Sequence, residues 1–366
     1  MSTTLPPPKK FNKKKFIEAL LAWFEKHKRD LPWRQTRDPY QIWIAEVMLQ
    51  QTQVATVIPF YERFLKTFPD VKSLARAKDT VLMKAWEGLG YYARARNLRD
   101  AARVIVEKHH SELPASREAL LELKGFGVYT AASVASLAFN QDYAAVDGNV
   151  MRVLSRVLVI ESDIRKPAAK REFQRIADSL VPMGRAGKFN EAMMELGALI
   201  CRPKNPACEG CPIRPYCRAY HENRLAEFPR KSKKAAIPHH QIVIGVVHKD
   251  GKVLIALRPS EGLLGNLWEF PGGKLKPEER LEACCAREML EETGIVVEVG
   301  ERFSVVQHSF THFRITLHAF HCRYVSGKAR PKTSQKIRWV KFADLENYAF
   351  PKANKKIIED LRRIDA

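Results

Sequence analysis

Two carboxylic acids in this sequence are placed where they could do chemistry. Glu46 lies in the stretch IWIAEVML (residues 42–49), which is apolar on every face of a helix and therefore predicts a buried helix. A buried carboxyl group needs a partner or takes up a proton, so its pKa rises. Asp147 lies in AVDGNV, just before a helix expected to start near Asn149. An acid poised near neutrality and a second carboxylate together cleave glycosidic bonds.

Each acid also has a structural interpretation. Glu46 could be a hydrogen-bonded acid with no catalytic role, and Asp147 is expected to cap the following helix in any case. A chemical role requires that the fold brings these two residues, which are distant in the sequence, to one cavity.

Four of the seven cysteines fall in one short loop, with the spacing Cys201-x6-Cys208-x2-Cys211-x5-Cys217. Four thiolates that converge from so short a segment can hold one soft-metal centre. Structural zinc is one interpretation, but it usually pairs two short C-x2-C segments. The uneven spacing favours a four-thiolate iron–sulfur cluster. An odd cysteine count without a secretion signal indicates a reducing compartment.

A second motif is the glycine turn in LLELKGFGVYTAA (residues 120–132). Gly125 and Gly127 lie between two predicted helices, so the chain can turn with its backbone amides exposed to an anion. Alone, such a turn is often only a tight connection. Because it follows Leu120 and Leu123 and precedes Thr130, the pattern indicates a helix–hairpin–helix that contacts DNA phosphates without reading sequence.

The elements that position these residues are helical up to about residue 200. Apolar residues recur at helical spacing in six segments: 16–28, 40–68, 97–108, 128–139, 170–180 and 190–201. After Pro238 the pattern changes to strands at 240–248 and 252–257, joined by Asp250-Gly251, then a helix at 277–292 and strands at 295–299, 303–308 and 313–324. We predict a disordered basic leader (1–14), an all-α domain (15–228), a linker (229–238) and an α+β domain (239–366).

The charge of the chain indicates a polyanionic partner. There are 62 Lys and Arg residues against 41 Asp and Glu, which gives a net charge of +21 and a pI near 9.7. Nucleic acid is the commonest such partner, although a basic protein can also be kept soluble by its charge or bind anionic lipid. The sequence has no apolar stretch long enough for a membrane span.

The segment AEVMLQQTQV around Glu46, the cysteine loop and the hairpin together resemble the MutY family of adenine DNA glycosylases, within the endonuclease III (helix–hairpin–helix) superfamily. The resemblance covers residues 31 to about 345. It implies an all-α glycosylase domain with a [4Fe–4S] cluster, then a Nudix-like α+β domain. The implied activity is removal of adenine mispaired with 8-oxoguanine or guanine in duplex DNA, after the nucleotide is flipped out of the stack.

The resemblance also implies the roles of the central residues. Glu46 would protonate N7 of adenine, Asp147 would stabilise the sugar cation, Asn149 would orient Asp147, and Tyr129 would hydrogen-bond within the site. Relatives that also nick the strand carry a lysine at the position of Tyr129, where its amine forms a Schiff base. The tyrosine therefore predicts a monofunctional enzyme.

Further residues match positions that contact DNA or the bases in the family. Leu49 and Gln51 would enter the duplex, Tyr91 would wedge beside 8-oxoguanine, and Phe310-Thr311-His312 would probe the damaged base. The adenine pocket would include Arg29, Trp33, Arg34 and Glu191. For Tyr92 we favour core packing.

The C-terminal domain departs from its family in retaining a complete Nudix box, from Gly273 through Glu279 and Arg287 to Ile295. Glu288, Glu291 and Glu292 fall on one helix face and could hold Mg²⁺ against a diphosphate. Hydrolysis of oxidised nucleotides is therefore an alternative second activity; otherwise this is an acidic, solvated helix face.

A third hypothesis is a lesion sensor without chemistry, which the joint presence of Glu46, Asp147 and Tyr129 disfavours. An endonuclease III-like enzyme for thymine lesions is disfavoured by Tyr129 and by the second domain. We expect a monomer with no membrane association, acting in the bacterial cytoplasm on the nucleoid.

Overall fold

The computed structural model of the chain describes residues 11–233 and 236–364. The chain separates into two compact units, each described by itself: unit 1 has residues 1–75 and 100–234, and unit 2 has residues 76–99 and 235–366. Most of the predicted leader (residues 1–10) lies outside the described residues, and the first helix begins at Lys13 rather than after residue 14. No helix in the described ranges is long and apolar enough to cross a membrane.

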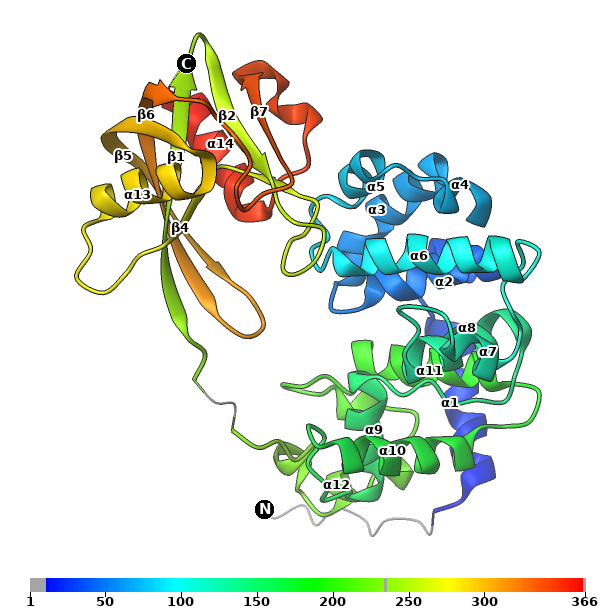
Figure 1. Cartoon of the computed structure of the whole chain (residues 1–366). Helices are drawn as coiled ribbons and strands as arrows, with labels where there is room; N and C mark the ends of the chain where they lie inside the picture. The colour runs from blue at the N-terminus through cyan, green and yellow to red at the C-terminus, as the bar shows by residue number, and fades with distance from the viewer. Residues whose placement is uncertain (1–10, 234–235, 365–366) are drawn as a thin grey trace. The chain divides into compact units, whose positions relative to one another are not determined.

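Unit 1 is built from helices alone (Figure 1). Its elements are α1 (Lys13–His27), η1 (Pro32–Arg34), α2 (Pro39–Leu49), α3 (Val54–Thr67), α4 (Val71–Ala75), α6 (Ala93–Lys108, in this unit from residue 100), α7 (Arg117–Leu121), α8 (Val128–Phe139), α9 (Gly148–Leu158), α10 (Pro167–Leu180), α11 (Ala186–Leu199), η2 (Cys208–Gly210), η3 (Arg214–Tyr216), α12 (Arg218–His221) and η4 (Leu225–Glu227).

Helix α2 is enclosed by its neighbours, as its apolar sequence predicts. The side chain of Asp38 caps it by accepting a hydrogen bond from the amide of Tyr40 (2.9 Å), and Pro39 occupies its first turn. Residues 42–48 are all buried, and the helix packs against α3 and α8. The prediction of a single helix over 40–68 is wrong: residues 50–53 separate α2 from α3, and Gln51 has a left-handed backbone (φ +58°).

A second core positions the N-terminal end of α9. Helices α1, α9, α10 and α11 bury one large cluster between them, which includes Phe16, Phe24, Val153, Phe173 and Phe189. This packing fixes α9, and with it Asp147 and Asn149 at its beginning. Gly197 on α11 permits the close approach of the two helices, because a Cβ there would lie 2.6 Å from the Cβ of Asn149.

Unit 2 contains a mixed sheet between two helices (Figure 1). Its elements are α5 (Asp79–Trp86), the first turns of α6, β1 (His239–Lys249), β2 (Lys252–Leu257), β3 (Trp268–Glu269), β4 (Gly272–Lys274), α13 (Leu281–Thr293), β5 (Ile295–Ser309), β6 (Arg314–Gly327), β7 (Lys336–Lys341), η5 (Phe342–Asn347) and α14 (Lys352–Ile364). The strand order is β3-β2-β1-β6-β5, with β4 also paired to β1 and β7 to β2; β1 and β6 run parallel.

Alternate residues of the strands face two different cores. Ile244 and Val246 pack with α14, whereas Val243 and Val247 pack with α13, so the two helices cover opposite faces of the sheet. The predicted turn at Asp250-Gly251 is confirmed between β1 and β2. Two predictions need correction. The strands expected at 295–299 and 303–308 are one strand with register shifts, and the helix expected from residue 277 begins at Leu281.

Candidate active site and cluster loop

A cavity of about 1500 Å³ in unit 1 brings the two acids together. It is lined by Glu46 and Asp147, together with Tyr129 and Asn149. The predicted base-contacting residues that also line it are Arg29, Trp33, Arg34, Leu49, Gln51, Gly125, Gly127 and Glu191. The cavity is large enough to admit a nucleoside.

Glu46 is held in the state expected of a general acid. Its side chain lies in the last turns of α2 and the residue is 4 % exposed. The hydroxyl of Tyr129 donates a hydrogen bond to Glu46 Oε2 (2.9 Å). Burial raises the pKa of Glu46 to about 7, although the hydrogen bond from Tyr129 acts in the opposite direction. Near neutral pH this carboxyl can therefore both hold and release a proton.

Asp147 is fixed through both of its carboxylate oxygens. It is the N-cap of α9: Oδ1 accepts from the amide of Val150 (2.7 Å), as predicted, and Oδ2 accepts from Asn149 Nδ2 (2.7 Å). Burial raises the pKa of Asp147, whereas these two hydrogen bonds stabilise its charged form. The carboxylate is thus oriented into the cavity at the positive end of a helix dipole.

A chain of hydrogen bonds connects Asp147 to the cysteine loop. Asn149 donates to Asp147 and its own Oδ1 accepts from Arg152 Nη2 (2.7 Å). Arg152 Nε donates to the carbonyl of Cys201 (2.7 Å), and its Nη2 donates to the carbonyl of Gly197 (2.8 Å). A displacement of the cysteine loop would therefore reach the carboxylate through two side chains.

Ion pairs between distant segments form one wall of the cavity. Arg34, in η1, donates to Glu191 Oε1 (3.0 Å) and to both oxygens of Glu195. Arg29 also binds Glu195. Trp33 is 9 % exposed and packs edge-on against Tyr61, so it contributes to the core as well as to the wall.

The predicted hairpin presents its backbone at the surface. Gly125 has φ +86°, which other residues rarely adopt, and Gly127 is the N-cap of α8 with open space around its Cα. Val128 at the start of α8 is 50 % exposed. This is the geometry in which helix N-terminal amides can meet a phosphate.

Sequence reasoning missed several residues of this cavity. Met194 lies 3.3 Å from the Tyr129 hydroxyl, and the buried acid Glu195 lies one turn after Glu191. Lys170, Arg171 and Arg175 of α10 also line the cavity. Their spacing puts them on one side of a helix, but the abundance of Lys and Arg throughout the chain conceals that signal.

The four loop cysteines surround one small apolar cavity beside α9. All seven cysteines of the chain are free, and burial raises the pKa of Cys211 and Cys217 to about 12. In the described part of the chain no three His, Cys, Asp or Glu side chains converge closely enough to hold a single metal ion. Four thiols that line one cavity are the ligand set of a [4Fe–4S] cluster, so the residues present fit the cluster that the resemblance implies.

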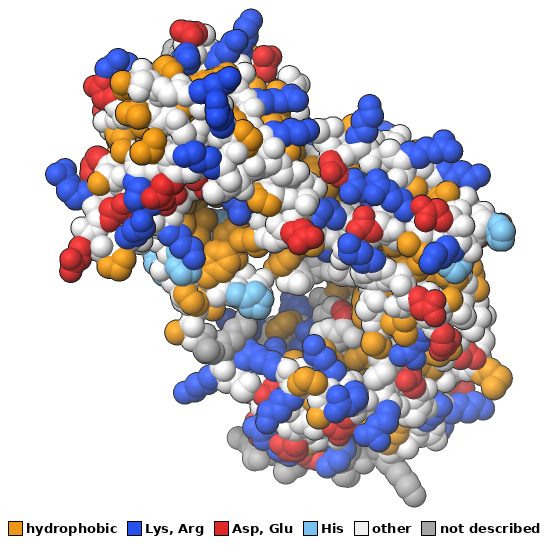
Figure 2. Space-filling model, viewed as in Figure 1, with side chains coloured by type: hydrophobic (Ala, Val, Ile, Leu, Met, Phe, Trp, Pro, Cys, Tyr) orange, Lys and Arg blue, Asp and Glu red, His pale blue; other side chains and the backbone are white. Residues whose placement is uncertain are grey.

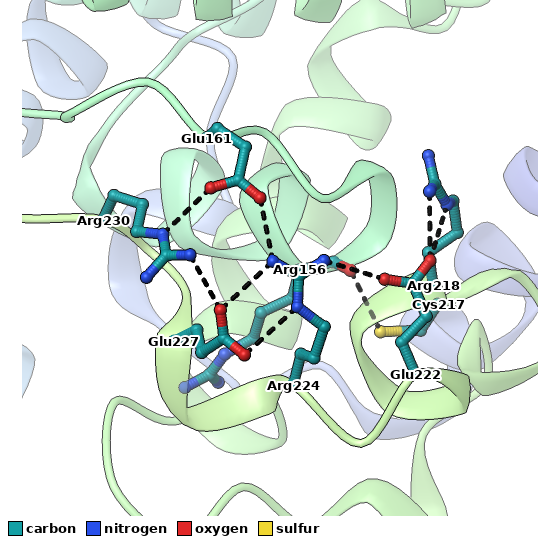
Figure 3. Close-up of polar contacts among 8 residues, drawn as sticks. All are labelled: Arg156, Glu161, Cys217, Arg218, Glu222, Arg224, Glu227 and Arg230. Carbon is teal, nitrogen blue, oxygen red and sulfur yellow. Dashed lines mark hydrogen bonds and ion pairs between the residues drawn. The ribbon is translucent and has the colours of Figure 1, made fainter.

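An ion-pair network fastens the end of this loop (Figure 3). Arg224 donates to Glu161, Glu222 and Glu227, and Arg230 donates to Glu161 (3.1 Å) and Glu227 (2.8 Å). Phe228 is 2 % exposed, and the guanidinium groups of Arg224 and Arg230 both lie over its ring. The first residues of the predicted linker are thus packed against unit 1.

Loss of one loop cysteine should release the cluster. We expect Cys211→Ser to lose the visible absorbance of the purified protein and to lower the free energy of unfolding of unit 1 by roughly 3 kcal/mol or more, because metal binding contributes directly to folding. Cys322→Ser is the matched control, since Cys322 is a buried free cysteine that belongs to unit 2 and not to the loop. Retention of full absorbance by Cys211→Ser would contradict the ligand assignment.

In unit 2, Tyr91 lies next to the predicted damage-probing hairpin. Its hydroxyl is 2.8 Å from Thr311 Oγ1, at the exposed tip that joins β5 to β6. Phe310 stacks on Phe313, so the tip presents Thr311 and His312 to solvent. Tyr91 has a left-handed backbone (φ +49°) and is 47 % exposed, whereas Tyr92 is buried, as expected.

The Nudix-box carboxylates are engaged with the protein itself. Arg287 forms hydrogen bonds with Glu279, Glu288 and Glu291, and Glu292 accepts from the amide of Gly272 (3.0 Å). Among the described residues, these acids form no cluster of three or more metal-binding side chains. The Mg²⁺ site therefore stays a prediction.

Two family models match the chain, one in each part. Residues 44–179 match the HhH-GPD superfamily of base excision DNA repair proteins, and residues 242–360 match the NUDIX domain. The helical part is similar to the solved structure of a thermostable thymine-DNA glycosylase, with 32% identity and a TM-score of 0.53, over 57% of this chain and 97% of that one. It also shares its fold with endonuclease III trapped on DNA (23% identity, TM-score 0.50, 59% of this chain and 100% of that one).

Relatives of known name match across both parts. The adenine DNA glycosylase of Mus musculus is 34% identical over 93% of this chain and 77% of its own length. That of Buchnera aphidicola subsp. Acyrthosiphon pisum (strain APS) is 30% identical over 95% of this chain and 98% of its own. With a helical repair domain, a Nudix-like domain and this coverage, the chain belongs to the adenine DNA glycosylase family of the HhH-GPD superfamily of base excision repair proteins.

Proposed function

We propose that this protein removes adenine from duplex DNA in which the adenine is mispaired with 8-oxoguanine or guanine. The observation that carries the proposal is the buried carboxyl of Glu46, whose pKa is near 7, in the same cavity as the fixed carboxylate of Asp147. Two carboxyl groups that line one cavity can serve as acid and as charge stabiliser. The many Lys and Arg side chains at the surface, visible in Figure 2, suit a DNA substrate.

The reaction follows from the contacts of the two acids. Because Tyr129 donates to Glu46 Oε2, Oε1 is the oxygen that carries the proton toward N7 of a flipped adenine. The C1′–N9 bond then breaks, and its electron pair leaves with the base. Asp147 stabilises the sugar cation until water adds at C1′ and gives up its proton to a carboxylate. When bound, the iron–sulfur cluster would hold the four cysteines together and order the loop that contacts Arg152.

We further propose that the enzyme is monofunctional, because Tyr129 at the cavity cannot form a Schiff base with the sugar. The test is a duplex containing adenine opposite 8-oxoguanine, incubated with the full chain. We expect free adenine and an intact strand that breaks only after alkali. Strand breaks without alkali would contradict monofunctional action, and the absence of free adenine would contradict the proposal itself.

The partner and setting are part of the same proposal: a monomer acting on nucleoid DNA in a bacterial cytoplasm. Nucleotide hydrolysis by the C-terminal domain is a weaker candidate, favoured only by the intact Glu279–Arg287 pair of its Nudix box. Mg²⁺-dependent phosphate release by the full chain, lost in Glu291→Gln, would support it.

A further inference from the structure

Glu195 is a buried acid to which the reaction above gives no role. It lies on α11, its side chain is 1 % exposed, and it lines the cavity that holds Glu46. A carboxylate so deeply buried is costly unless it is fully hydrogen-bonded. The buried Glu195 carboxylate therefore requires hydrogen-bond donors, and the identity of these donors indicates its role.

Five donors from Arg29 and Arg34, which lie in one segment far from α11 in the sequence, converge on the Glu195 carboxylate. Oε1 accepts from the Arg29 amide (2.9 Å), Arg29 Nε (2.8 Å) and Arg34 Nη1 (3.2 Å). Oε2 accepts from Arg29 Nη2 (2.7 Å) and Arg34 Nη2 (3.0 Å). The two guanidinium groups hold the pKa of Glu195 at about 2, so it is an anion at neutral pH.

These hydrogen bonds, together with the contacts below, fix the guanidinium group of Arg34 in one orientation. Its Nη1 also donates to the carbonyl of Arg29 (3.0 Å), its plane lies over the ring of Phe24, and its remaining edge, Nε, donates to Glu191 Oε1 (3.0 Å). Glu191 is one helical turn before Glu195 on α11. Glu191 Oε2 accepts no hydrogen bond from any residue that the structure describes, and Glu191 lines the cavity.

The same residues separate two cavities. A second cavity of about 310 Å³ shares Arg29, Arg34, Arg37 and Glu191 with the larger one, so the Arg34–Glu191 pair has open space on both sides. A partition of long side chains keeps its shape only when a rigid group holds them, because each otherwise samples many rotamers.

We propose that Glu195 is a positioning residue for base selection: it fixes Arg34, and through Arg34 the free oxygen of Glu191, at the wall of the cavity. The inference rests on the proposed function. A fixed carboxylate oxygen accepts a hydrogen bond from the exocyclic amine of adenine and repels the carbonyl that guanine or hypoxanthine presents at the same ring position. Glu195 itself touches no substrate atom.

The test compares two bases opposite 8-oxoguanine in otherwise identical duplexes. Single-turnover release of adenine and of hypoxanthine is measured for the full chain and for Glu195→Gln. We expect the adenine-to-hypoxanthine rate ratio to fall at least tenfold in the variant. A smaller folded fraction lowers both rates equally, so the ratio reports positioning rather than stability. The conservative variant Glu195→Asp, which keeps the charge, should recover part of the ratio.

A control variant and a double variant test whether the effect of Glu195 passes through Arg34 and Glu191. Glu25→Gln is the matched control, because Glu25 also pairs with two cations, Lys28 and Lys188, beside the second cavity, yet does not contact Arg34. In a Glu191→Gln background, Glu195→Gln should change the ratio no further, since its effect passes through Glu191. An unchanged ratio in Glu195→Gln, with adenine release intact in the parent chain, would overturn the proposal. Absence of adenine release from the parent chain would instead defeat the proposed function.

Discussion

Glu46→Gln should bind adenine-containing duplex with unchanged affinity and release adenine about 10²–10⁴-fold more slowly, the range that general acid catalysis supplies. Glutamine has the same shape and can still accept the hydrogen bond from Tyr129, but it has no proton to transfer. In the parent chain the rate should fall as the pH rises through 7, because ionisation removes the proton that the reaction needs. Single-turnover rates from pH 5 to 9 measure both effects.

Although Glu46→Gln should slow adenine release, it should raise the free energy of unfolding at alkaline pH. The folded chain keeps the Glu46 proton up to a pH of about 7, whereas the unfolded chain loses it near 4.5. The parent chain therefore loses stability as the pH rises between these values, by on the order of 3 kcal/mol. Glu46→Gln should be more stable than the parent at pH 8 and equally stable below pH 4.5, as measured by denaturant unfolding.

Glu62→Gln, on the exposed face of α3, is the control for both measurements and should behave as the parent. Full adenine release by Glu46→Gln would refute the assignment of the acid. A free energy of unfolding that does not respond to pH would refute the buried, protonated state.

The second large effect is expected for Asp147→Asn. Asparagine is as good an N-cap as aspartate, so α9 and the fold should be preserved. The negative charge that stabilises the sugar cation is lost, and we expect adenine release to slow at least ~10²-fold, as when one electrostatic stabiliser is removed. Rates are compared at saturating enzyme, with circular dichroism to verify the fold.

The matched control is Asp38→Asn, which makes the same chemical change at the N-cap of α2, outside the cavity lining. It should leave the rate unchanged. If both variants slowed the reaction equally, the role of Asp147 would be structural.

The local features of the site could be predicted from the sequence. The enclosure of α2 and the burial of Glu46 follow from a segment with no polar face and are confirmed. Burial in turn raises the pKa of Glu46. The cap made by Asp147 follows from its place before a helix and is confirmed. The roles of the site residues in catalysis and base reading stay predictions.

Long-range and strained features could not be predicted. Glu195 joins Arg29 across 166 positions, and nothing local distinguishes it from a surface acid on an amphipathic helix. The break after α2 contains neither Gly nor Pro; it includes Gln51, which has a left-handed backbone that its residue type does not signal. Residues 76–99 fall inside the predicted all-α domain (15–228), yet their contacts group them with unit 2.

The fastening of residues 228–232 has a mechanical consequence. Arg156 binds the carbonyl of Phe228, the carbonyl of Arg230 accepts from the amide of Ile164, and the amide of Ser232 donates to Asp163. Tension along the backbone from the C-terminal side would therefore act on these hydrogen bonds before it reaches Cys217. The four cysteines of the loop are thereby isolated from tension in the segment that follows Ser232.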